Sequence, residues 1–138
     1  MTKELELKEL PIDSQIKANK RKKQKTVALD FDGVIHQYTG WNEGVLGVPI
    51  SGAVELIKVL QANGAEVIVF TAREVEPISD WLIKHDIRVP IITNIKLSRV
   101  DVFVDDRALS FLPIDYLDVE LFARKLLLFE PYWKNHAG

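Results

Sequence analysis

Two aspartates that follow a short apolar run are the residues of this chain best suited to do chemistry. The run 27–29 (Val-Ala-Leu) leads into Asp30, and Asp32 and Gly33 follow directly after Phe31. Residues two apart in extended chain point to the same side, so both carboxylates can face one small volume. Two such anions need a hard cation such as Mg²⁺, which prefers oxygen ligands, and one carboxylate can still attack an electrophile. Because calcium loops and ordinary turns also contain D-x-D-G, the interpretation depends on the rest of the chain.

The elements that must position these aspartates alternate between strand and helix. Apolar runs predict strands at 26–30, 65–70, 89–93 and 101–104. Helical spacing predicts one helix between an N-cap at Ser51 and a stop at Asn63-Gly64, another over about 77–85, and a closing helix over 115–129. Strands separated by helices indicate an α/β fold: an open, doubly wound, Rossmann-like parallel sheet with helices on both faces.

Polar side chains follow each predicted strand. Asp30 and Asp32 come after the first, Thr71 after the second, Lys96 after the third, and Asp105 and Asp106 after the fourth. In open parallel sheets ligands bind beyond the carboxyl ends of the strands. The sequence therefore predicts that these side chains converge on one crevice.

This ordered set of motifs resembles the haloacid dehalogenase (HAD) superfamily, and in particular its phosphatase branch. The resemblance covers residues 27–107 and leaves out residues 1–25. It implies a HAD-like catalytic domain over 26–138, an Mg²⁺ cofactor, and hydrolysis of a phosphomonoester through an aspartyl-phosphate. Asp32 favours phosphoryl chemistry, because the dehalogenases of the superfamily lack a second aspartate.

The resemblance also implies a role for each motif residue. Asp30 resembles the nucleophile, and Asp32 the general acid and base whose backbone carbonyl binds the metal. Thr71 and Lys96 would contact the transferring phosphoryl group. Asp30, Asp32, Asp105 and Asp106 would hold Mg²⁺, and which of the last two binds it directly stays open. Arg99 lies three residues after Lys96, so the site cation is either one, with Lys96 preferred.

The spacing between motifs leaves no room for a lid domain. Residues 30 and 71 are 41 positions apart, and residues 71 and 96 are 25 apart. The resemblance therefore points to the small capless members, whose sites are open. The stretches 71–74 and 105–107 are also similar to the phosphatase domain of polynucleotide kinase-phosphatases, which implies that Ala72 and Arg73 contact the substrate. A nucleotide or polynucleotide end is thus an alternative substrate.

Composition sets wider limits on function. The chain has 138 residues, no cysteine and a net charge of −2, so disulfides, thiolate metal sites and cysteine nucleophiles are excluded. No apolar run is long enough to cross a membrane and no secretory leader begins the chain, so we expect a cytoplasmic protein that does not bind membranes. Six of the 18 basic residues lie between Lys17 and Lys25. This charged segment either binds nucleic acid or, as charge runs more often do, is a solvated flank.

Two further alternatives concern the whole protein and one loop. A receiver-like signalling domain also groups aspartates, a threonine and a lysine around Mg²⁺, but it carries its acidic pair first, whereas this chain places Asp105-Asp106 last. A phosphate-binding domain without activity is also conceivable. In the loop 33–50, His36, Tyr38 and Trp41 either form a flap that stacks on a base or sugar, or anchor the loop.

Overall fold

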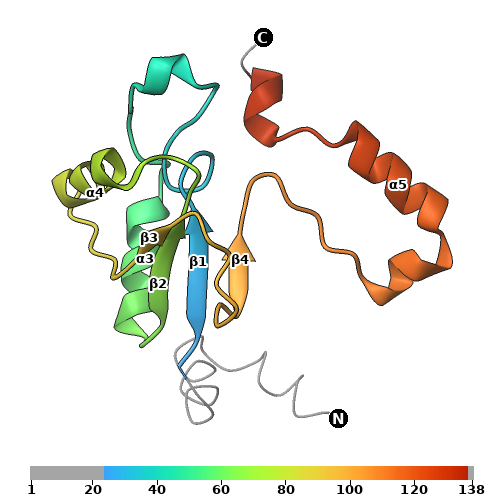
Figure 1. Cartoon of the computed structure of the whole chain (residues 1–138), viewed down its shortest axis with the longest axis horizontal. Coiled ribbons are helices and arrows are strands. Elements are labelled where there is room, and N and C mark those ends of the chain that lie inside the picture. The colour runs from blue at the N-terminus through green and yellow to red at the C-terminus, as the bar shows by residue number, and fades with distance from the viewer. Residues whose placement is uncertain (1–23, 137–138) are drawn as a thin grey trace.

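A four-stranded parallel sheet forms the centre of the protein. The computed structural model describes residues 24–136 (Figure 1). The sheet contains β1 (Thr26–Asp30), β2 (Glu66–Phe70), β3 (Ile92–Thr93) and β4 (Val102–Val104), in the order β3-β2-β1-β4. All pairs are parallel, and Asp30 lies beside Phe70 at the end of the β1–β2 register. The α/β class with a Rossmann-like parallel sheet is therefore confirmed, and no cap domain is present among the described residues.

One face of the sheet carries the hydrophobic core. Alternate residues of β1 and β2 pack with α3 (Ala53–Ala62) and α4 (Val75–Lys84). The helices contribute Ile57, Ile78, Trp81 and Leu82, and all four are buried. Both helices cover the same face, because the two crossovers step in the same direction across the sheet and parallel crossovers are almost always right-handed.

Within the described residues, the helices that cover the sheet therefore lie on one face, and the expected second layer is absent there. On the other face, Phe70 and Phe103 contact each other edge to face, with ring centroids 5.6 Å apart. The predicted N-cap at Ser51 is also not formed, since Gly52 occupies that position with no side-chain cap. The end of α3 at Ala62, with Asn63 as its C-cap, agrees with the predicted stop, while α4 begins two residues and ends one residue before the expected bounds.

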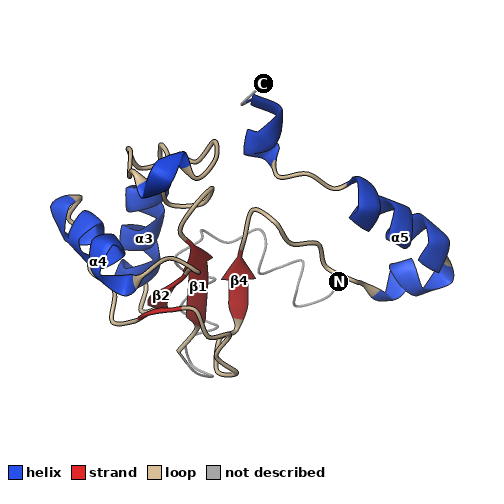
Figure 2. Cartoon of the chain, turned by 45° about the horizontal axis from the view of Figure 1, so that its top comes forward, coloured by secondary structure: helices blue, strands red, loops and turns tan. Residues whose placement is uncertain are grey.

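The predicted closing helix does not close the sheet. Its sequence forms a 3-10 turn, η2 (Pro113–Leu117), followed by the shorter helix α5 (Val119–Leu128), which has no buried residue. Figures 1 and 2 show α5 standing apart from β4 in both views. The chain then returns to the sheet through η3 (Tyr132–His136). Helical spacing predicts that a segment is helical, but not which surface it covers.

Two predictions remain, one on the basic N-terminal segment and one on membrane-spanning helices. The basic segment from Lys17 to Lys25 lies almost wholly outside the described residues, as does the rest of 1–23. Among residues 24–136, no helix has the length and apolarity to span a membrane.

Candidate functional site

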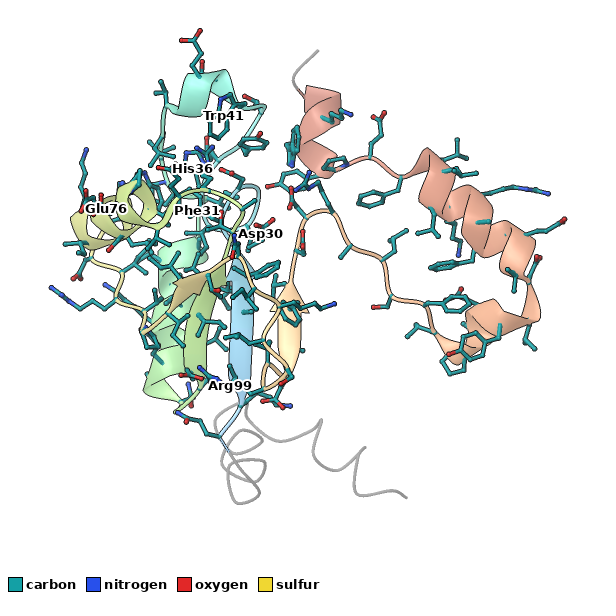
Figure 3. The ribbon with its side chains drawn as sticks, in the orientation of Figure 1. Asp30, Phe31, His36, Trp41, Glu76 and Arg99 are labelled. Atoms are coloured by element: carbon teal, nitrogen blue, oxygen red, sulfur yellow. The ribbon has the colours of Figure 1, made fainter. Side chains whose placement is uncertain are left out.

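A cavity of about 540 Å³ opens beyond the carboxyl ends of β1 and β2. Six of the residues predicted from the sequence line it: Asp30, Asp32, Thr71, Ala72, Arg73 and Asp106. Asp30 ends β1, and Figure 3 shows it at the tip of that strand. Thr71 follows β2 directly and Asp106 comes two residues after β4. The parallel register brings these strand ends together, as the sequence predicts.

Three carboxylates form an acidic cluster, and two of them, Asp30 and Asp106, line the cavity. Asp30, Asp105 and Asp106 each present an oxygen, and these atoms lie within 4.8 Å of one another. Their separation suits a single divalent ion bound by oxygens. Of the four predicted metal ligands, Asp32 is the one whose carboxylate lies outside this cluster. It binds Arg73 instead.

The environment of Asp106 tests whether a cation fits. Its Oδ2 accepts a hydrogen bond from the indole N–H of Trp133, whereas its Oδ1 is buried and has no hydrogen-bond partner among the described residues. A buried carboxylate oxygen without a donor is costly unless a cation satisfies it. Gly33, at φ +83°, makes this arrangement possible, because a Cβ there would lie 2.4 Å from Asp106 Oδ2. The donor set therefore fits Mg²⁺.

The electrostatics of the cluster lead to the same conclusion. Burial, followed by contact with Asp106 and the charge of Asp105, raises the pKa of Asp30 from 3.8 to about 9. Burial also disfavours the Asp106 anion, but a proton on Asp30 and the Trp133 N–H outweigh burial and hold the pKa of Asp106 below its ordinary value. Without a cation, the cluster keeps a proton on Asp30. A divalent ion would replace that proton and leave Asp30 ionised.

Asp32 is held as an anion by two partners. Arg73 donates from Nε to Asp32 Oδ2 at 2.6 Å and from NH2 to Oδ1 at 3.1 Å, and His36 Nδ1 lies 2.9 Å from Oδ1. Burial opposes ionisation, but the hydrogen bonds from His36 and Arg73 prevail and lower the pKa of Asp32. Sequence reasoning assigned Arg73 to the substrate; in this structure it pairs with Asp32 at the cavity wall.

His36 belongs to the support of Asp32 and not to a flap. It is 3% exposed, its ring stacks on Phe31 with centroids 4.9 Å apart, and Trp81 packs against its edge. Its Nε2 accepts the backbone N–H of Gly47 at 2.7 Å, so Nδ1 carries the proton and donates it to Asp32. Figure 3 shows His36 above Phe31 near the tip of β1. The spacing of four residues between Asp32 and His36 gave no sign of this contact.

Thr71 occupies a strand end with its hydroxyl partly engaged. The residue is 4% exposed, its backbone N–H donates to Thr93, and its Oγ1 accepts the backbone N–H of Arg73 at 3.2 Å. A hydroxyl that accepts one bond still has its own hydrogen free to donate. Thr71 can therefore donate to an oxygen atom in the cavity.

The two cations proposed for the site lie elsewhere. Lys96 does not line the cavity, and its Nζ stands 5.2 Å from the ring centroid of Phe103. Arg99 binds the carboxylate of Glu66, the first residue of β2, and Figure 3 shows it at the opposite end of the sheet from Asp30. The alternative that Arg99 is the site cation is therefore wrong. Lys96 remains a prediction that needs its long side chain to turn toward the cavity.

The C-terminal turn η3 contributes residues that sequence reasoning missed. The Tyr132 hydroxyl donates to the Gly33 carbonyl at 2.6 Å, and Trp133 binds Asp106 and meets the Tyr38 ring edge to face at 4.7 Å. Trp133, Tyr38 and Trp41 line the cavity together. No local sequence signal marks these contacts, because they join residues far apart in the chain: Tyr132 and Gly33 are 99 positions apart, and Trp133 and Asp106 are 27 apart.

Comparisons with known proteins give a structural neighbour and no family. No protein-family model and no curated protein matches the chain. One similar solved structure is described as the structure of the conserved protein coded by locus from Bacteroides thetaiotaomicron, with 26% identity and a TM-score of 0.52. The match covers 74% of this chain and 92% of that one. It supports the α/β fold and carries no information on activity.

Proposed function

We propose that this protein is a Mg²⁺-dependent phosphomonoester hydrolase of the HAD type that acts through an aspartyl-phosphate. The observation that carries the proposal is the acidic cluster, in which Asp30 ends β1 beside Asp105 and Asp106 and also lines an open cavity. This position supports the proposal, because it would let Asp30 share a cation with its neighbours and also meet a substrate. When bound there, Mg²⁺ would supply the positive charge that lets a carboxylate approach a phosphoryl group.

The reaction would proceed in two displacements. In the first, an Asp30 oxygen bonds to phosphorus as the bond from phosphorus to the ester oxygen breaks. The leaving alcohol takes its proton from the Asp32 carboxyl, which would become protonated once the bound phosphate has drawn Arg73 away from it. In the second, water attacks the phosphorus of the aspartyl-phosphate, which regenerates the Asp30 carboxylate and releases phosphate. Thr71 would donate to a phosphoryl oxygen during both steps.

The ionised state of Asp32 suits the second displacement better than the first. A carboxylate held by Arg73 and His36 can accept a proton from attacking water, but it has none to give to a leaving alcohol. A phosphate that draws Arg73 away from Asp32 would raise the proton affinity of that carboxyl. Arg73 would then bind the phosphate by the same planar donors.

The direct test is hydrolysis of an aryl phosphate with and without Mg²⁺. We expect turnover that a chelator abolishes and Mg²⁺ restores, and loss of at least about 10³-fold in Asp30→Asn, since the nucleophile is then missing. Asp80→Asn removes an exposed carboxylate of α4 and is the matched control with full activity. Full activity in Asp30→Asn would remove the proposed nucleophile. A phosphorylated protein that persists for hours would instead indicate a receiver-like domain.

A narrower candidate, a nucleotide or polynucleotide end phosphatase, is favoured by the aromatic side of the cavity. Trp41 is 59% exposed, and its ring lies 4.6 Å from the Arg73 guanidinium carbon. Tyr38 and Trp133 complete this side, and flat rings of this kind stack on nucleobases. The test compares kcat/KM for a nucleoside monophosphate or a terminal-phosphate oligonucleotide with that for a sugar phosphate. Trp41→Ala should lower kcat/KM for the nucleoside monophosphate and the oligonucleotide but not for the sugar phosphate. An equal loss of kcat/KM on all three substrates would contradict the candidate.

A further inference from the structure

We propose that the C-terminal arm of this protein, residues 107–131, packs on the β4 face of a second copy, so that the protein is a dimer with exchanged arms. The inference does not depend on the proposed function. It begins with the distribution of exposed apolar side chains. Among the described residues, 23 large hydrophobic side chains are exposed, and 12 of these lie in the arm. Three of its leucines, Leu117, Leu127 and Leu128, are more than 80% exposed.

The arm is a preformed unit and not loose chain. Phe111 contacts the rings of Tyr116 and Phe122, with centroids 4.7 and 4.8 Å away, and so joins the incoming chain to α5. The helix also has an N-cap, because the Asp118 carboxylate accepts the backbone N–H of Leu121. An ordered helix that buries no residue carries apolar surface that water disfavours, and such a patch marks an interaction site.

The complementary surface lies on the same chain, at β4. In the register, Val102 and Val104 lie beside Val27 and Leu29 on the face that α3 and α4 cover. Those helices do not extend over the edge strand, since Val102 and Val104 are 46% and 38% exposed whereas Leu29 is 1% exposed. Among residues 24–136, this edge therefore lacks the helix that a parallel strand normally packs against. Within the part of the chain that the structure describes, one apolar helix thus has no sheet to cover, and one strip of sheet has no helix over it.

The two ends of the arm determine which copy supplies the helix. One end continues from the β4 tip, and the other is fixed where Tyr132 and Trp133 bind Gly33 and Asp106. Between these fixed ends α5 stands out from its own sheet (Figures 1 and 2). Packing on its own β4 would require the arm to fold back, whereas packing on another copy leaves every described contact in place. Each copy then gives one helix and receives one, which produces a closed two-fold dimer.

The first experiment measures the mass of the full chain in solution by light scattering over a range of concentrations. We expect twice the 15.7 kDa of one chain. Leu128→Glu in the arm and Val104→Glu on β4 should each return the mass to that of a monomer. Ile83→Glu, at a 56% exposed position on α4, is the matched control and should stay dimeric. A monomer at all concentrations, or a dimer that neither variant disrupts, would overturn the proposal.

A second experiment needs no disruptive charge and identifies the contact itself. Because the chain has no cysteine, Val104→Cys and Leu121→Cys each introduce a single thiol. A short bismaleimide should link the two variants when they are mixed, giving a pair that contains one chain of each kind. Linkage within one chain of the double variant, with no linked pair in the mixture, would show that the arm covers its own strand and would refute the exchange.

Discussion

Replacing Asp30 by asparagine should change how the stability of the metal-free protein depends on pH. The folded protein holds a proton on Asp30 up to a pKa of about 9, whereas the unfolded chain releases it near 3.8. Because the folded pKa is raised, this group contributes its full stability below pH 3.8 and loses it as pH rises toward 9. The asparagine variant cannot titrate there and should lack this component.

The size of the effect follows from proton linkage. One extra proton in the folded state lowers the free energy of unfolding by about 1.4 kcal/mol per pH unit at most. The carboxyl is partly exposed, so solvent screening reduces the size of the pKa shift and shortens the pH interval over which that slope applies. We therefore expect about 1 kcal/mol between pH 6 and 8. For a domain of this length, that corresponds to a fall in Tm of about 3–5 °C.

The assay is thermal unfolding in chelator at a series of pH values, followed by circular dichroism. The wild-type Tm should fall from pH 6 to 8 relative to Asp30→Asn, while Asp80→Asn, at an exposed carboxylate, follows the wild type. Adding Mg²⁺ should remove most of the wild-type fall, because the cation replaces the proton. Parallel curves for wild type and Asp30→Asn would refute the reasoning about the cluster.

Four other predictions concern single residues. Asp32→Asn should reduce kcat/KM, which reports the first displacement, by about 10²–10⁴-fold on alkyl phosphates and by less on aryl phosphates, since an aryl oxide leaves without a proton; equal losses in kcat/KM would argue against an acid role. His36→Ala should lower kcat and change KM little. His36→Asn should restore part of the lost kcat, because its amide can again donate to Asp32, as steady-state kinetics would show. Gly33→Ala should lower stability by about 1–3 kcal/mol and weaken Mg²⁺ stabilisation in thermal melts, because the new Cβ meets Asp106. Arg99→Ala should leave kcat/KM unchanged and the thermal stability close to that of the wild type, since the variant loses only an exposed ion pair with Glu66; a large loss of kcat/KM would mean that Arg99 acts at the site.

The strand ends were predictable from sequence because their signals are local. An apolar run that stops at Asp30 marks a buried strand and its tip, and the same reading applies to Thr71 and Asp106. Parallel topology then requires the tips to meet at one edge, so Asp30, Asp32, Thr71, Arg73 and Asp106 could be placed at one cavity before any coordinates were known. Lys96 carried no such constraint, because it lies in a loop whose path the sequence does not specify.

Only the tertiary structure decided which side chains face one another, both between residues far apart in the chain and within the loop 33–50. The indole N–H of Trp133 reaches Asp106, and His36 turns inward to Asp32, because packing around Phe31 and Trp81 fixes the loop that carries it. The path of α5 away from β4 could not be predicted from the sequence either, since amphipathic spacing defines an apolar surface but not the sheet that this surface covers. Sequence periodicity specifies local geometry, whereas contacts between distant residues depend on how the whole chain packs.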